Sequence, residues 1–146
     1  MTDEFIHYSH SIGNNLHHLE WCTKYRYKIF AKNHTRETLR QLIYIACNQY
    51  HIKPIELSIL PDHVHLIAQL HPTMSQSKAI QLLKGFTSYM LFKTIPNLRL
   101  RYPKGNLWSR GNFKDSIGRI TSEAAKKYVR EQNHVYQMSL GDFSFI

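Results

Sequence analysis

The chain has 146 residues, 42% of them hydrophobic, which suits one compact domain with a sizeable core. Lysine and arginine outnumber aspartate and glutamate by 19 to 10, and the formal charge of +9 favours polyanionic partners such as nucleic acid. No apolar run is long enough to cross a bilayer, and the first residues are acidic rather than signal-like, so we expect a cytoplasmic, nucleoid-associated protein with no membrane partner.

We expect a single domain over residues 1–146, with three parts that differ in pattern. Residues 1–15 show little periodicity and form an N-terminal extension. Residues 16–134 carry the regular apolar patterns and form the core, and residues 135–146 form a C-terminal tail.

The first half of the core predicts a strand, a helix and a pair of strands. Apolar and aromatic residues alternate over 16–27, which is typical of a strand. Apolar residues recur at helical spacing over 35–50. Residues 52–60 and 63–70 then read as two strands, and the short Pro61-Asp62 connection favours an antiparallel hairpin.

The second strand of this hairpin begins with His63-Val64-His65. Because side chains alternate along a strand, His63 and His65 point to one face and form half of a metal site. Neutral imidazoles suit Mn, Zn, Fe or Ni, and also Mg where phosphate oxygens complete the shell. Asp62 could orient a ligand or simply serve the turn. The plain alternative is a pair of partly exposed strand histidines.

The second half predicts a helix, a strand and a further helix. Apolar spacing indicates a helix over 76–93, with Thr73 and Gln76 as a possible capping box and Pro96 after its end. A short strand follows at 113–117 and a helix at 122–135. The order βαββαβ predicts an α+β, ferredoxin-like or RRM-like antiparallel sheet with helices on one face, plus an extra C-terminal helix.

Cations and aromatic side chains are interleaved over residues 99–114, after the predicted helix 76–93. The cations are Arg99, Arg101, Lys104, Arg110 and Lys114, and the rings are Tyr102, Trp108 and Phe113. Cations follow phosphates and exposed rings stack on unpaired bases, so the segment predicts a platform for single-stranded or hairpin nucleic acid. Core packing is the alternative for the rings, Trp108 above all.

The last predicted helix places Tyr128 and Gln132 one turn apart on one face. Tyr128 is a candidate nucleophile, because the neighbouring cations Lys127 and Arg130 would favour the phenolate. The amide oxygen of Gln132 is a donor that could complete the histidine pair as a third metal ligand. A tyrosine packed on the sheet beside a solvated cationic face is the alternative.

The two cysteines, Cys22 and Cys47, fall in a predicted strand and a predicted helix. Neither has a second cysteine at metal-ligand spacing, so we expect reduced, buried thiols.

At these positions the chain resembles the TnpA-type single-tyrosine transposases of the HUH endonuclease superfamily, including their REP-associated relatives. The likeness covers residues 16–134. It rests on Trp21-Cys22-Thr23-Lys24-Tyr25-Arg26, Pro61-Asp62-His63-Val64-His65-Leu66, Lys84-Gly85, Leu107-Trp108, Ser116-Ile117-Gly118, Tyr128 and Gln132.

The resemblance implies a transposase that binds hairpins at the ends of an insertion sequence. It implies Mg- or Mn-dependent cleavage and rejoining of single-stranded DNA through a 5′-phosphotyrosine on Tyr128, with His63, His65 and Gln132 as metal ligands. It also implies a homodimer in which one subunit can deliver Tyr128 to the histidines of the other. We add four cations to the expected DNA contacts, Lys24 and Arg26 in the first predicted strand and Lys127 and Arg130 in the last predicted helix.

Two other classes remain open on the sequence. A non-catalytic single-stranded nucleic-acid-binding module can share the βαββαβ order, and a domesticated, repeat-associated nuclease would keep the same motifs. A histidine-triad hydrolase needs a further alternating histidine, whose place Ile67 takes.

Overall fold

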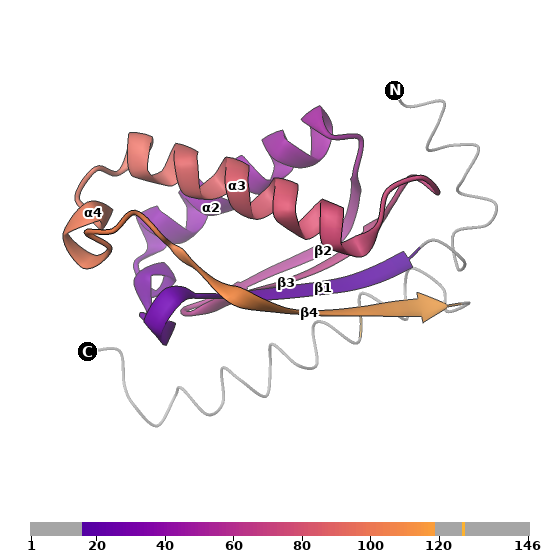
Figure 1. Ribbon diagram of the computed structural model, residues 1–146, viewed down its shortest axis with the longest axis horizontal. Coiled ribbons are helices and arrows are strands. Elements are labelled where there is room, and N and C mark those ends of the chain that lie inside the picture. The colour runs from indigo at the N-terminus through magenta and orange to yellow at the C-terminus, as the bar shows by residue number, and fades with distance from the viewer. Residues whose placement is uncertain (1–15, 119–126, 128–146) are drawn as a thin grey trace.

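The described part of the chain, which in this computed structural model comprises residues 16–118 and 127, folds as one sheet covered by helices (Figure 1). The strands are β1 (Leu16–Thr23), β2 (Lys53–Leu60), β3 (His63–Gln69) and β4 (Trp108–Gly118), and the helices are α2 (Asn33–Gln49), α3 (Gln76–Thr94) and the short α4 (Leu98–Arg101). The strand order is β2-β3-β1-β4, with every neighbouring pair antiparallel. The predicted α+β, ferredoxin-like class is confirmed.

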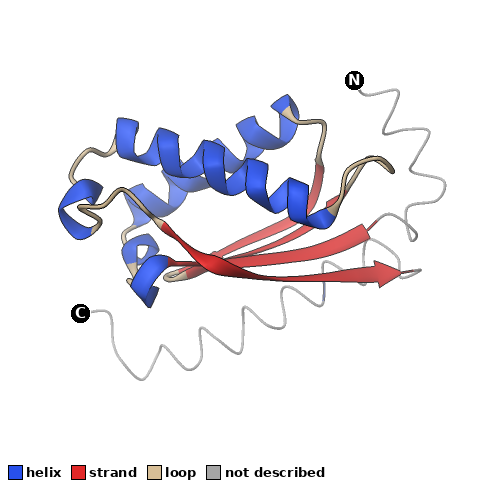
Figure 2. Ribbon diagram, in the orientation of Figure 1, coloured by secondary structure: helices blue, strands red, loops and turns tan. Residues whose placement is uncertain are grey.

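Helices α2 and α3 lie together on one face of the sheet (Figure 2). Their buried positions follow the helical period and are Leu39, Leu42, Ile43, Ala46 and Cys47 in α2, and Ala79, Ile80, Leu83, Thr87 and Leu91 in α3. Trp108 and Trp21 meet edge to face beneath them, with ring centroids 6.0 Å apart, a contact worth about 0.5–1.5 kcal/mol beyond the buried area. Within the described residues, no helix is long and apolar enough to cross a membrane.

The central strands β1 and β3 carry different chemistry on their two faces. Leu19, Trp21, Val64 and Leu66 belong to the core beneath the helices. Successive strand residues point to opposite faces, so the side chains between them point away from the helices. Those on β1 are His18 and Glu20, and those on β3 are His63 and His65. The sheet thus separates an apolar core from a polar, histidine-bearing face.

The hairpin between β2 and β3 has the predicted two-residue connection. Leu60 pairs with His63, which leaves only Pro61 and Asp62 in the turn. Backbone hydrogen bonds hold this turn from outside, from Thr23 N–H to the Asp62 carbonyl at 2.9 Å and from Phe30 N–H to the Pro61 carbonyl at 3.0 Å. The start of β3 is therefore fixed to the end of β1.

Four elements, β1, α3, β4 and α4, differ from the sequence prediction. The first strand ends at Thr23 rather than at residue 27, because Lys24 N–H turns away to the Leu107 carbonyl at 2.8 Å and the chain enters a 3₁₀ turn, Lys24–Arg26. Helix α3 is capped by Ser75, whose hydroxyl accepts from Lys78 N–H at 3.0 Å, and not by a Thr73 capping box. Strand β4 begins at Trp108 and is longer than expected, and α4 was not predicted.

The extension 1–15, most of the predicted helix 122–135 and the tail 135–146 lie outside the described residues. Within that helix only Lys127 is described, and it is helical and exposed.

The two cysteines give a direct test of this packing. Burial in α2 raises the pKa of the Cys47 thiol to about 12, so at pH 8 it stays protonated and unreactive. Cys22 is only partly buried. We expect a thiol reagent such as DTNB to modify Cys22 alone in the native protein, and both cysteines in guanidinium chloride. Reaction of a native Cys22→Ser variant at the rate of the unfolded chain would contradict this packing.

Candidate active site

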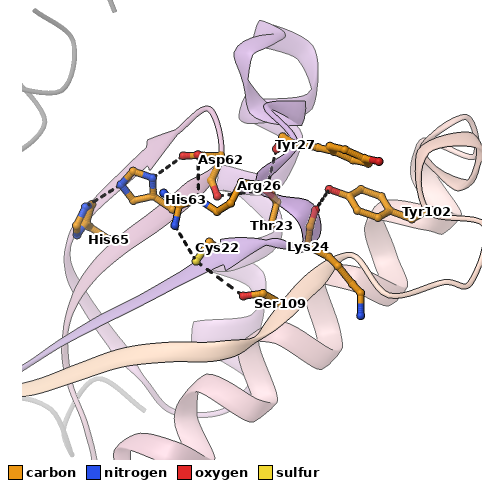
Figure 3. Close-up of polar contacts among 10 residues, drawn as sticks. All are labelled: Cys22, Thr23, Lys24, Arg26, Tyr27, Asp62, His63, His65, Tyr102 and Ser109. Carbon is orange, nitrogen blue, oxygen red and sulfur yellow. Dashed lines mark hydrogen bonds and ion pairs between the residues drawn. The ribbon is translucent and has the colours of Figure 1, made fainter. Parts of the chain in front are cut away.

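The first strand positions of β3 bring two imidazoles together at the surface opposite the helices. His63 and His65 are both buried, and their Nε2 atoms are 3.2 Å apart. Their rings meet edge to face with centroids 4.9 Å apart. The predicted pair therefore shares one face and directs the same nitrogen of each ring toward one point (Figure 3).

The other nitrogen of His63 is held by a carboxylate. His63 Nδ1 lies 2.7 Å from Asp62 Oδ1, and Arg26 Nε donates to Asp62 Oδ2 at 3.1 Å. Burial alone would raise the pKa of Asp62, but hydrogen bonds from His63 and Arg26, together with their charges, lower it below its ordinary value. A carboxylate at Nδ1 fixes the tautomer in which Nε2 of His63 keeps its lone pair for a ligand.

The other nitrogen of His65 faces β1. Its Nδ1 lies 2.8 Å from His18 Nε2 and 3.7 Å from Glu20 Oε2. Burial, with the charges of His63 and His18 in addition, lowers the pKa of His65 to about 3. His65 is consequently a neutral imidazole at pH 7, the form that binds a cation.

These positions fit a divalent cation. Ligand atoms at right angles around an ion, each at about 2.1 Å, are about 3.0 Å apart, close to the Nε2 separation of His63 and His65. A second, overlapping donor group also exists, because ligand atoms of His18, Glu20 and His65 all lie within 4.8 Å of one another. His65 belongs to both groups.

The sequence prediction missed His18 and Glu20. They stand two residues apart in the first predicted strand, so their common face could be read from the sequence. Their approach to His65 depends on the register that pairs Glu20 with His65 and Cys22 with His63. The pattern of one strand does not specify that register.

The structure leaves part of the predicted site untested. Tyr128, Gln132 and Arg130 lie outside the described residues, and Lys127 is exposed. Their roles as nucleophile, metal ligand and phenolate-stabilising cations therefore stay predictions.

The predicted DNA-binding cations fall into two groups. Lys24 and Arg26 follow β1, near Arg99 and Arg101 of α4 and Lys104 of the next loop, while Arg110 and Lys114 lie on β4. All are exposed except Lys24, which is partly exposed. Gly105 permits the loop after α4, because its φ of +77° is one that other residues rarely adopt.

The three aromatic residues predicted to stack on bases differ in their exposure to solvent. Tyr102 and Trp108 are buried, and Trp108 Nε1 donates to Thr87 Oγ1 at 3.0 Å inside the core. Of the three, Phe113 alone is exposed, at 49%. The prediction that Tyr102 and Trp108 stack on bases is therefore wrong, because both rings are buried among other aromatic side chains. The interleaving of cations and rings in the sequence did not reveal this burial.

The carboxylate behind His63 yields a testable expectation. In an Asp62→Asn variant the ion pair with Arg26 and the anionic partner of His63 Nδ1 are lost, so affinity for Mn²⁺ should fall by about 10- to 100-fold. Isothermal titration calorimetry measures this directly. Glu37→Gln is the matched control, because Glu37 pairs with Arg40 at 3.2 Å on α2. Equal Mn²⁺ affinity in Asp62→Asn and wild type would refute the positioning role.

Comparison with known proteins gives a consistent result. The family model described as "Transposase IS200 like" matches residues 11–132. The transposase for insertion sequence element IS200 of Salmonella typhimurium is 27% identical over 124 residues, covering 85% of this chain and 80% of the relative. The ISDra2 transposase TnpA of Deinococcus radiodurans is 26% identical over 117 residues, covering 80% of this chain and 83% of the relative.

Two solved structures share the fold. One, assigned as a transposase from Deinococcus radiodurans R1, has a TM-score of 0.65 and 25% identity, and the match covers 80% of this chain and 89% of that chain. The other is a REP-associated tyrosine transposase bound to a REP hairpin, with a TM-score of 0.56 and 15% identity over 91% of this chain and 70% of that chain. At 15% identity, the second likeness shows that the fold is shared.

Proposed function

Because the chain belongs to the IS200-like transposase family and is thus an enzyme that cleaves and rejoins DNA, we propose that it acts on single-stranded DNA through a covalent bond to Tyr128. The substrate we propose is a strand that carries hairpins near the ends of an insertion sequence. The solved relative bound to a REP hairpin supports this choice.

The geometry of His63 and His65 is the observation that supports this function most. Two imidazoles with Nε2 atoms 3.2 Å apart, each with its Nδ1 in contact with a neighbouring side chain, are positioned to share one ion. We propose Mg²⁺ or Mn²⁺, with Gln132 as the third protein ligand. When bound, such an ion polarises the phosphodiester and offsets the negative charge that builds up during phosphoryl transfer.

In the proposed reaction, the phenolic oxygen of Tyr128 attacks the scissile phosphorus. The oxygen–phosphorus bond to tyrosine forms as the bond to the 3′-oxygen breaks, which leaves a 3′-hydroxyl and a 5′-phosphotyrosine. Lys127 and Arg130 favour the phenolate that this attack requires. Attack of another 3′-hydroxyl on the phosphotyrosine rejoins the strands, and no nucleotide cofactor is needed because the ester keeps the bond energy.

We propose that the exposed cations hold the DNA backbone. Arg26, Arg99, Arg101 and Lys104 lie around the end of β1, and Arg110 and Lys114 lie along β4. Contacts of this kind make binding strongly dependent on salt. We further propose a homodimer in which Tyr128 of one subunit can serve the histidine pair of the other.

A strand-specific trapping experiment tests this function. A hairpin-bearing single strand is incubated with the protein and Mn²⁺ or Mg²⁺, labelled in parallel samples at its 5′ or its 3′ end. We expect the 3′-labelled fragment to become covalently attached to protein, the 5′-labelled fragment to be released with an extendable 3′-hydroxyl, and EDTA to prevent both. Cleavage without an adduct would indicate a hydrolytic nuclease, and binding without cleavage would indicate a non-catalytic module.

A further inference from the structure

The 3₁₀ turn after β1 holds two large residues in a backbone conformation that side chains rarely adopt. Tyr25 has φ +62° and Arg26 has φ +56°. A bulky residue with positive φ costs conformational free energy, and such residues concentrate at functional sites. The strained backbone therefore makes this turn a candidate for a functional role.

Arg26 contacts the carboxylate that orients His63 in the candidate active site. Its guanidinium donates to Asp62 Oδ2 at 3.1 Å, and Asp62 in turn holds His63 Nδ1 at 2.7 Å (Figure 3). Two contacts thus connect the strained turn to the histidine pair. The neighbouring residue, Tyr25, stands in the same turn, but its ring stacks on Tyr102. Tyr102 and Tyr27 lie on the opposite side of the turn from the histidine pair (Figure 3).

Tyr25 presents its ring to solvent, where 60% of the residue is exposed. Beneath it, Tyr102 is buried and nearly parallel, with an interplanar angle of 11° and centroids 6.4 Å apart, and Tyr27 is tilted against both. The Tyr102 hydroxyl donates to the Lys24 carbonyl at 3.1 Å, which ties the ring layer to the backbone of the turn. These three rings form a supported aromatic cluster whose outer member is Tyr25.

Cations surround this aromatic cluster. Lys24 Nζ lies 5.6 Å from the centre of the Tyr25 ring, and Arg101 Cζ lies 4.3 Å from the centre of the Tyr27 ring. Arg99 covers Phe92 at 4.6 Å, and the edge of Phe92 meets Tyr102. An exposed ring framed by positive charge matches an unpaired base with its flanking phosphates.

We propose that Tyr25 is a stacking platform for one unpaired base of the bound DNA strand beyond the end of β1, with Lys24 and Arg101 contacting the flanking phosphates. This inference rests on the proposed single-stranded DNA substrate. It replaces Tyr102, which is buried, by Tyr25 as the ring that meets DNA. It also accounts for the positive φ at Tyr25, because the same turn directs Arg26 to Asp62 and exposes the Tyr25 ring to solvent.

Binding without chemistry tests the proposal. Affinity for a fluorescent hairpin-bearing single strand is measured by anisotropy in EDTA, so that neither metal nor cleavage contributes. We expect Tyr25→Ala to weaken binding by about 5- to 100-fold and Tyr25→Phe to bind like wild type, because a phenyl ring still stacks. Tyr25→Gly should lose affinity equally while keeping or raising the melting temperature, since glycine accepts the positive φ.

Tyr89→Ala is the matched control. Tyr89 is 66% exposed on α3 and has Lys93 Nζ 5.9 Å from its ring centre, but it lies on the helix layer, away from the histidine face. We expect this variant to bind like wild type. Equal losses in Tyr25→Ala and Tyr89→Ala would overturn the proposal by showing a general effect of exposed rings.

An abasic scan identifies the base. Each unpaired nucleotide is replaced in turn by an abasic one. At one position the abasic substitution should weaken binding by the wild-type protein as much as Tyr25→Ala does. The same substitution should cause no further loss of affinity in the Tyr25→Ala variant. Wild-type affinity in Tyr25→Ala, or additive losses at every position, would overturn the platform while leaving the proposed function intact. A wild-type protein that does not bind single-stranded DNA would overturn the proposed function as well.

Discussion

Tyr128→Phe should lose both strand cleavage and the covalent adduct, by at least about 1,000-fold, while binding hairpin DNA with wild-type affinity. The variant lacks only the phenolic oxygen, so the size and apolar packing of the side chain are preserved. A denaturing gel with 3′-labelled substrate measures the adduct, and anisotropy in EDTA measures binding. The separation of these two readouts distinguishes loss of the nucleophile from loss of folding.

Tyr136→Phe is the control, because it removes the same oxygen from the next tyrosine along the chain. It should cleave and form the adduct like wild type. Adduct formation by Tyr128→Phe would end the assignment of the nucleophile, and loss of the adduct in Tyr136→Phe alone would transfer that role to Tyr136.

The second large effect is expected at His65. This residue belongs to both donor groups, since Nε2 faces His63 and Nδ1 faces His18 and Glu20. We expect His65→Ala to weaken Mn²⁺ binding by more than about 100-fold and to abolish cleavage, because the variant removes from each of the two groups the imidazole that it needs. Electron paramagnetic resonance of free Mn²⁺ measures the binding of the ion, and the end-labelled strand measures cleavage.

The neighbours of His65 then identify which group holds the ion. If His63 and His65 bind it, His63→Ala should match His65→Ala, and Glu20→Gln should have the smaller effect expected of a residue that only orients His65. The opposite ranking would assign the ion to His18, Glu20 and His65. His34→Ala, at an exposed position of α2, should bind Mn²⁺ like wild type. Full Mn²⁺ binding by His65→Ala would exclude both groups.

Periodicity predicted the elements whose burial is regular. Helices α2 and α3 each bury a face at the spacing that their sequences show, and the Pro61-Asp62 turn marks the β2–β3 hairpin. The existence and order of these elements were therefore predictable. The 3₁₀ turn Lys24–Arg26 was not, because positive φ at Tyr25 and Arg26 is imposed by contacts with Asp62 and Leu107, which are distant in sequence. The alternating residue pattern over 24–27 favours continuation of the first strand.

The same distinction applies to the active site. The pair His63 and His65 is local, since two residues in one strand share a face whatever surrounds them. Of the partners that orient the pair, Glu20 lies on β1 and Arg26 in the 3₁₀ turn after it, and the antiparallel register between β1 and β3 brings both near the histidines. Burial of Tyr102 beneath its exposed neighbours is likewise a property of the packed molecule.

The two-residue turn between β2 and β3 restricts how this protein could change during evolution. Insertion or deletion of one residue at Pro61–Asp62 would shift β3 relative to β1, and a shift by one residue exchanges the two faces of a strand. Val64 and Leu66 would then face outward and the imidazoles would enter the apolar interior. Among lineages that retain activity, length variation should therefore accumulate in the loop after α4 and be purged from this hairpin.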